Sequence, residues 1–188
     1  SCSQVLPLLK NRSADVRKVA ALALSLVGDR AAAMPLAILL HDSDPMVAQV
    51  AEHALWSVWF RLGKPQAVQL VKCGNMHMHH GNNECAIEKF TQAIQEDAGF
   101  AEAYNQRAIA LYLSERFAEA IEDCQRALVL MPQHFGAMAG KGHSHAHLAQ
   151  WREARQAYRL ALAIHPGLEG IEQSLAQIEQ LLAENPTL

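Results

Sequence analysis

Residues 101–134 read AEAYNQRAIALYLSERFAEAIEDCQRALVLMPQH, and this stretch decides the fold. Its small, aromatic and proline residues recur downstream at one constant offset, which matches Phe117 with Trp151, Ala120 with Ala154, Ala127 with Ala161, Leu128 with Leu162 and Pro132 with Pro166. Ala86, Ala93 and Ile94 stand at the corresponding places upstream. A period of about 20–50 residues is typical of helical-repeat proteins. The sequence therefore divides into three ungapped units of equal length, 67–100, 101–134 and 135–168.

The whole chain is predicted to be all-α. Strand signals are almost absent, and apolar residues recur at intervals of three and four. After the third unit, apolar residues keep this helical spacing at Ile171, Leu175, Ile178, Leu181 and Leu182. Residues 169–188 are therefore assigned as a capping helix, which covers the last unit, and a tail.

The middle unit resembles a tetratricopeptide repeat (TPR). Tyr104 stands at the usual Trp/Tyr position and Ala108 at the small one, followed by Ala120, Ala127 and Pro132. The third unit keeps most of this pattern, whereas the first has Ala98 where proline is usual. The resemblance implies helical hairpins that stack into a right-handed superhelical solenoid, with small residues letting the helices of a hairpin approach to about 8–10 Å.

Residues 1–66 follow a different and shorter period. It pairs Val16 with Val47, Val19 with Val50, Ala20 with Ala51, Ala23 with Ala54 and Leu24 with Leu55. The segment SADVRKVAALALSLVGD, residues 13–29, resembles the first helix of a short HEAT repeat, although Ala48 replaces Arg17 in the second copy. Asp44-Pro45 predicts the start of the next helix.

This register has two consequences. It aligns residues 5–10 with 36–41, so the chain opens on the second helix of a partial repeat and is expected to be a fragment of a larger protein. It also puts the last HEAT-like helix at about 65–73, where the first TPR helix begins. One helix is therefore predicted to serve both arrays, in a continuous solenoid without a flexible linker.

Composition excludes several classes of partner. The 188 residues include 16 basic and 19 acidic side chains, a net charge of −3, so no basic surplus is available for nucleic acid. The uncharged stretch Ala31 to His41 is too short to insert into a membrane. Cys2, Cys73, Cys85 and Cys124 lack CxxC spacing and are interpreted as free thiols, which favours a reducing, cytoplasmic location.

No catalytic motif is present in the sequence. It contains no GxSxG, HExxH or GxxxxGK[ST] pattern, and Gly140-Lys141-Gly142 falls inside a predicted helix, where it cannot cradle a phosphate. The chain is therefore predicted not to be an enzyme and to need no cofactor.

Histidine is unusually abundant, with ten residues, of which six fall in the segments 76–80 and 143–147. His143 and His147 lie four apart on one helix face and could share a transition metal, but a third ligand is missing. The two segments lie two repeats apart, about 20 Å, so they cannot share an ion. His77 and His145 stand where the repeat usually has Tyr, which favours a packing role, and no metal site is predicted.

The TPR resemblance implies a concave groove lined by the first helix of each repeat. Transferring the family's groove positions gives Val71, Lys72, Asn75, Met78 and His79 in the first unit, Glu102, Asn105, Gln106, Ile109, Tyr112 and Leu113 in the second, and Ala139, Gly140, His143, Ala146 and His147 in the third.

The groove departs from the carboxylate-clamp subclass, which grips a peptide's terminal carboxylate with Lys and Arg. Asn75 fits that subclass, but Gly136 and Gly140 stand where the third repeat would supply Lys and Arg. A receptor for chaperone tails is therefore not expected. Ile109 and its neighbours Tyr112 and Leu113 favour an apolar or helical segment instead, with Asn105 and Gln106 bonding its backbone.

The function predicted from the sequence is a non-enzymatic interaction scaffold that binds a protein or peptide in the TPR groove. One alternative is a structural spacer or a dimerisation arm with an empty groove, and the dimerisation arm would make the chain a homodimer. A less favoured alternative is a metal-binding module that uses the histidines.

Overall fold

The computed structural model describes residues 1–185, which are helical throughout apart from turns. The chain divides into two compact units, one of Ser1–Leu62 with Ile164–Gly167 and one of Gly63–Ala163 with the chain from Leu168 onward. The sequence periods predict the boundary after residue 66, which lies inside a helix that begins at Pro65. In the structure, the boundary lies between Leu62 and Gly63, before that helix.

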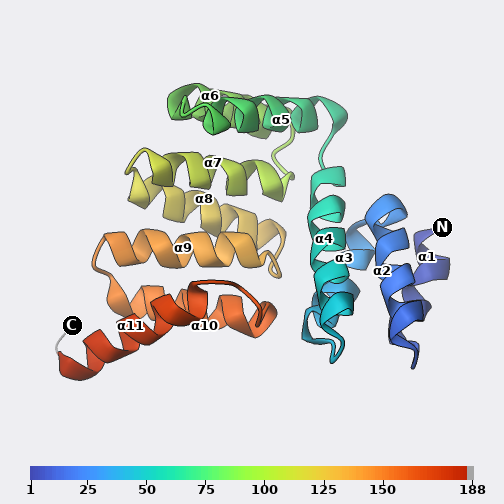
Figure 1. Cartoon of the computed structure of the whole chain (residues 1–188). Coiled ribbons are helices and arrows are strands. Elements are labelled where there is room, and N and C mark those ends of the chain that lie inside the picture. Colours follow the sequence, from blue (N-terminus) through green and yellow to red (C-terminus); the bar gives the residue numbers. More distant parts are fainter. Residues whose placement is uncertain (186–188) are drawn as a thin grey trace. The chain divides into compact units, whose positions relative to one another are not determined.

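The first unit contains four α-helices and two 3-10 turns (Figure 1). Its elements are α1 (Cys2–Val5), η1 (Leu6–Lys10), α2 (Ala14–Val27), α3 (Arg30–Ile38), η2 (Leu39–His41) and α4 (Pro45–Arg61). Helices α2 and α4 pack against each other, and the repeat-matched pairs Ala20 with Ala51 and Leu24 with Leu55 are buried. The resemblance to HEAT repeats stays a prediction.

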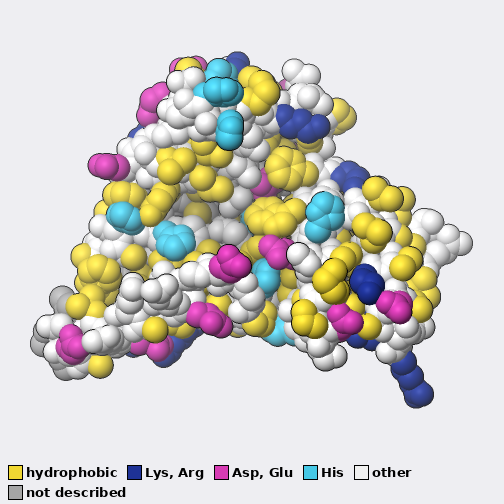
Figure 2. Space-filling view, in the orientation of Figure 1, with side chains coloured by type: hydrophobic (Ala, Val, Ile, Leu, Met, Phe, Trp, Pro, Cys, Tyr) yellow, Lys and Arg dark blue, Asp and Glu magenta, His cyan; other side chains and the backbone are white. Residues whose placement is uncertain are grey.

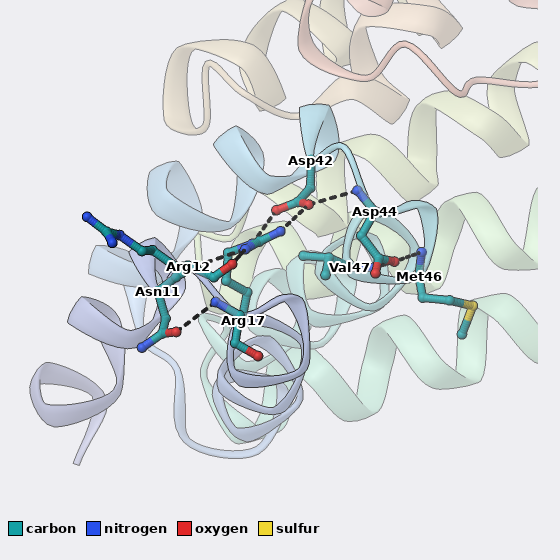
Figure 3. A network of polar contacts seen from close by, with 8 residues as sticks. Asn11, Arg12, Arg17, Asp42, Asp44, Met46 and Val47 are labelled. Atoms are coloured by element: carbon teal, nitrogen blue, oxygen red, sulfur yellow. Dashed lines mark hydrogen bonds and ion pairs between the residues drawn. The ribbon is translucent and has the colours of Figure 1, made fainter.

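Arg17 and Asp42 join the start of α2 to the turn before α4 (Figure 3). Arg17 Nε and Nη2 donate to the two carboxylate oxygens of Asp42 at 2.6 and 2.7 Å. Arg17 Nη1 also donates to the carbonyls of Asn11 and Arg12. The bidentate guanidinium holds the pKa of Asp42 below its ordinary value. The pair therefore fixes two turns of the unit by charge-assisted hydrogen bonds.

Helix α4 begins where the sequence predicts. The Asp44 carboxylate accepts from the backbone N–H of Met46 at 2.9 Å, and Pro45 occupies the first helical position. The carboxylate satisfies a backbone donor that has no partner inside the helix, and proline at the first position has no N–H that would need one.

The second unit is a series of helical hairpins (Figure 1). Its helices are α5 (Pro65–His79), α6 (Asn83–Glu96), α7 (Ala101–Leu113), α8 (Phe117–Leu130), α9 (Phe135–His147), α10 (Trp151–Ile164) and α11 (Ile171–Glu184). Consecutive helices pack against one another, as in a solenoid. Within residues 1–185, every helix is too short or too polar to span a bilayer.

The backbone of the second unit repeats as regularly as its sequence. Gly81, Glu115 and Ala149 occupy corresponding places in the three successive repeats, each in the turn of a hairpin. All three have left-handed φ angles, of 76°, 60° and 56°. This conformation is rare for residues other than glycine. The hairpin turn therefore keeps one geometry even where the sequence does not supply glycine.

Glycine allows close packing inside the first and third hairpins. A Cβ atom built on Gly74 would lie 2.4 Å from the ring of Phe90, and one built on Gly142 would lie 2.5 Å from the ring of Tyr158. No real Cβ atom tolerates such a contact. In both hairpins, an aromatic ring of the second helix therefore lies directly against the backbone of the first.

Helix α11 covers the last hairpin. Ile171 and Ile178 are buried in one cluster with Tyr158 and Ala161 of α10, and Leu175 and other apolar residues pack around it. Of the apolar stripe that the spacing predicts, Ile171 and Ile178 are thus buried, and Leu175, Leu181 and Leu182 are half-buried.

Candidate peptide-binding groove

The predicted groove residues lie on α5, α7 and α9. In the structure α7 contacts both α5 and α9, so the three helices form one continuous face of the second unit. Figure 2 shows hydrophobic side chains gathered over α7 and α9, with histidines among them.

An apolar pocket of about 250 Å³ opens in this face. The residues that line it come from α7, α8 and α9, and they are Asn105, Ala108, Ile109, Tyr112, Leu113, Cys124, Gly140 and His143. Ile109 and Leu113 are exposed, whereas Ala108 and Cys124 are buried. The exposed pair therefore lines the mouth and the buried pair the floor, an arrangement that accepts an apolar side chain from outside.

The floor of the pocket exists because the middle hairpin lacks an aromatic ring. Cys124 occupies the position that corresponds to Phe90 in the preceding repeat and to Tyr158 in the following one. Burial raises the pKa of the Cys124 thiol to about 12, so the floor is uncharged at neutral pH. Sequence reasoning missed Cys124, although the repeat register contains the signal.

Tyr112 stands at the rim and already has partners. Its hydroxyl lies 2.7 Å from Nε2 of His147. Its ring meets Phe117 edge-on at 5.5 Å, and the imidazole of His147 stacks on Phe117 at 4.5 Å. His147 therefore takes up one hydrogen bond of the Tyr112 hydroxyl, and the ring is held between α8 and α9.

His143 is held on the pocket wall by the last hairpin. Its Nδ1 lies 2.8 Å from the hydroxyl of Tyr158. Burial, and then the nearby His147, lower the pKa of His143 below its ordinary value. His143 is therefore neutral at physiological pH. Among the described residues, no three His, Cys, Asp or Glu side chains lie close enough together to hold a metal ion.

The TPR resemblance places Glu102 on the groove surface, but the structure buries it fully, so it cannot touch a ligand. Its carboxylate accepts from Nε2 of His134 at 2.9 Å and from Nε2 of Gln106 at 2.5 Å. His134 Nδ1 accepts from the N–H of Ala137, so the ring hydrogen must be on Nε2. Asn105, also buried, adds a long contact of 3.5 Å. This network joins α7 to the start of α9 and holds the groove helices in register.

The remaining predicted groove residues differ in exposure. Val71 is fully buried, so its predicted groove exposure is also wrong. Asn75 is half-buried, and its Oδ1 atom has no hydrogen-bond donor among the described residues. In the rest of the set, Lys72, His79 and His147 are exposed, Met78, Gln106, Gly140 and Ala146 are half-buried, and Ala139 is buried.

A family model for the tetratricopeptide repeat matches residues 101–134, the range of the middle unit. The helix pairs of the second unit are tetratricopeptide repeats. Among curated relatives, sperm-associated antigen 1 of Rattus norvegicus is 29% identical over 109 residues, which are 58% of this chain and 12% of the rat protein. The chain thus corresponds to a small part of that relative.

Two solved TPR domains resemble this chain more completely. The first TPR domain of Spaghetti (RPAP3), bound to the HSP90 peptide SRMEEVD, is 27% identical with a TM-score of 0.62 over 63% of this chain and 94% of that one. The second TPR domain of human RPAP3, in complex with the HSP70 peptide SGPTIEEVD, is 30% identical with a TM-score of 0.59 over 61% and 95% of the two chains.

Proposed function

We propose that this chain is a non-enzymatic interaction scaffold whose TPR groove binds a protein or peptide segment through an apolar anchor. The apolar pocket between α7, α8 and α9 carries this proposal. Its mouth is formed by Ile109 and Leu113, which expose apolar surface that an inserted side chain would bury. The peptide complexes of similar TPR domains support the general mode of binding.

The charge of the groove favours a neutral segment over an acidic tail. The peptides bound by the similar domains end in the acidic sequence EEVD. Gly136 and Gly140 supply no charge at the positions where a carboxylate clamp has Lys and Arg. Among the predicted groove residues Lys72 is the only Lys or Arg, and it is exposed. An acidic tail would therefore find a single permanent positive charge among the predicted groove residues.

A display library of random peptides, selected against the full chain, tests this function. We expect selected peptides to be neutral and to carry a shared apolar residue. The HSP90 peptide SRMEEVD serves as the comparison probe in a fluorescence anisotropy titration and should bind at least tenfold more weakly than they do. Tight, salt-sensitive binding of SRMEEVD would overturn the proposal, because it would require a cationic groove.

Exposed apolar residues of the first unit favour a second candidate, a dimerisation arm. Leu26 is 73% exposed and Ile38 63%, and an apolar groove lies between η1 and α3. Such surface is typical of protein contacts. Sedimentation velocity distinguishes the candidates: a dimer that is weakened by Ile38→Glu but not by Tyr112→Ala would support the arm.

The four cysteines support a proposed cytoplasmic location. Cys2, Cys73, Cys85 and Cys124 are all free thiols in the fold, as suits a reducing compartment.

A further inference from the structure

We infer that the groove pocket takes an aromatic side chain of the partner, a ring that replaces the one missing from the middle hairpin. The occupant is a neutral peptide segment that presents a phenylalanine-like ring. This inference rests on the proposed function and names the chemistry of its anchor.

The neighbouring hairpins show what this space holds when the chain fills it. Phe90 and Tyr158 are both buried, and each ring lies against a glycine of the preceding helix. The middle hairpin has the same backbone period and the same turn geometry. Its corresponding space is therefore sized for a ring, but Cys124 fills only part of it, and the rest is the pocket.

Ala108 and Cys124 depart from the pattern together. Gly74 and Gly142 must lack a Cβ because a ring lies within 2.4–2.5 Å of where it would be. Ala108, at the corresponding position, has a Cβ, which an internal ring at position 124 would strike. Ala108 and Cys124 together therefore leave open the space that a ring fills in the other two hairpins.

Two further features keep the pocket open and suited to a ring. Gly140 lines it without a side chain, and a Cβ there would lie 3.5 Å from the sulfur of Cys124. Tyr112 and His143 both line the space, with ring centroids 6.3 Å apart and ring planes tilted by 54°. A ring that enters between them can form offset or edge-to-face aromatic pairs, which contribute beyond the burial of their surface.

The double variant Ala108→Gly/Cys124→Phe tests the inference on the full chain. It recreates the glycine–ring pair of the other hairpins, so it should fold and fill the pocket from within. Toluene is the probe for the ring site, since cavities lined by apolar side chains bind small aromatics. We expect toluene to shift the NMR signals of Tyr112 and His143 in the natural chain and to leave the double variant unchanged. The matched control Cys124→Ala keeps the pocket and should bind toluene as before.

Peptides from the display selection test the partner's side. We expect a fixed Phe, Tyr or Trp in the selected peptides and at least a ~30-fold loss of affinity on the double variant, as for a central hot spot. Gly140→Leu fills the pocket from α9 and should cause the same loss of peptide affinity. This second variant keeps the test valid if the double variant does not fold.

Three outcomes would overturn the inference. Failure of toluene to bind the natural chain would show that the pocket does not accept a ring. Peptides anchored by a fixed Leu, Ile or Met would leave the proposed function standing and refute the aromatic anchor. If toluene binds but no peptide is selected, the proposed function fails as well.

Discussion

The hydroxyl of Tyr112 on α7 lies 2.7 Å from Nε2 of His147 on α9, although the two residues are 35 positions apart. The contact crosses from the middle repeat to the third, directly at the rim of the pocket. Because His147 also stacks on Phe117 of α8, three helices meet around one aromatic cluster. The proposed ligand binding and the stacking of the repeats therefore involve the same side chains, and different substitutions of Tyr112 are needed to separate the two.

Tyr112→Phe and Tyr112→Ala separate these roles. The phenylalanine variant loses only the hydrogen bond to His147, so the free energy of unfolding should fall by about 1 kcal/mol or less. It should keep peptide affinity, because the ring remains. Tyr112→Ala removes the ring from the pocket and should weaken a selected peptide by about 2 kcal/mol or more, measured by isothermal titration. Equal affinity for all three chains would place the binding site elsewhere.

Stability should fall in mild acid because of His143. Its pKa is lowered in the folded chain, first by burial and then by His147, from an ordinary value of 6.5. As the pH falls below that value, the unfolded chain therefore binds more protons at this residue than the folded chain does. The free energy of unfolding falls until His143 is also protonated in the folded chain. Thermal melts from about pH 7.5 to 5 should show this slope.

His143→Gln is the matched variant for the acid melts, because it can still bond to Tyr158 but does not titrate. The chain has ten histidines, so only the difference between the two slopes reports on His143. We expect a shallower slope in the variant. Equal slopes in the natural chain and in the variant would show that His143 does not cause the loss of stability in acid.

Ala120→Leu tests the core of the middle hairpin. Ala120 is fully buried in one cluster with Ala108, Leu111 and Cys124. Added volume there should overpack the hairpin and lower the free energy of unfolding by about 1–3 kcal/mol in urea denaturation. Ala118→Leu, on the exposed side of the same helix, should change it by about 0.5 kcal/mol or less. A similar cost for both variants would mean that the repeat register is wrong.

The junction between the units should resist trypsin. Arg61 Nη1 donates to the carbonyl of Gly28 at 2.8 Å. The Lys64 backbone N–H donates to Asp97 at 2.9 Å, and its Nζ to the carbonyl of Glu96 at 3.1 Å. Both cleavage sites are therefore tied to their own unit, whereas cleavage needs a locally unfolded backbone.

Limited proteolysis followed by mass spectrometry should therefore show cuts near the termini before any cut from 61 to 69. Lys10 and Arg12, both exposed, are the internal reference sites. The prediction of a continuous solenoid depends on this result. Early cleavage at the junction would instead show two independent domains. The junction itself is only partly packed, since Ala67 and Val71 are buried while Gln66 and Gln69 are exposed.

The hairpins could be predicted because their determinants recur in the sequence. Helix α8 ends at Leu130, just before Pro132, as the repeat pattern requires. The first hairpin has Ala98 in place of that proline, yet α6 ends at the same point, at Glu96. There the Asp97 side chain accepts from the N–H of Gly99 at 3.1 Å, a local bond that replaces the helical one.

The sequence could predict which helices line the groove, but not which of their side chains are exposed in it. A repeat position shows which helix a residue belongs to, whereas its exposure depends on what covers it. Glu102 is buried because His134, at the end of the same repeat, closes over its carboxylate. The pocket floor could not be predicted from the residues that keep the repeat pattern, because it depends on Cys124, which departs from that pattern.

The ion pair of Arg17 and Asp42 affects how many copies of its repeat the first unit can contain. Both of its ends fall within one period, the interval that separates Val16 from Val47, and one period later the same positions hold Ala48 and Cys73, which cannot form it. A tandem duplication of residues 14–44 would reproduce both ends of the pair in each copy. The number of repeats could thus increase at this point by a single genetic event, and each new repeat would contain its own Arg–Asp ion pair.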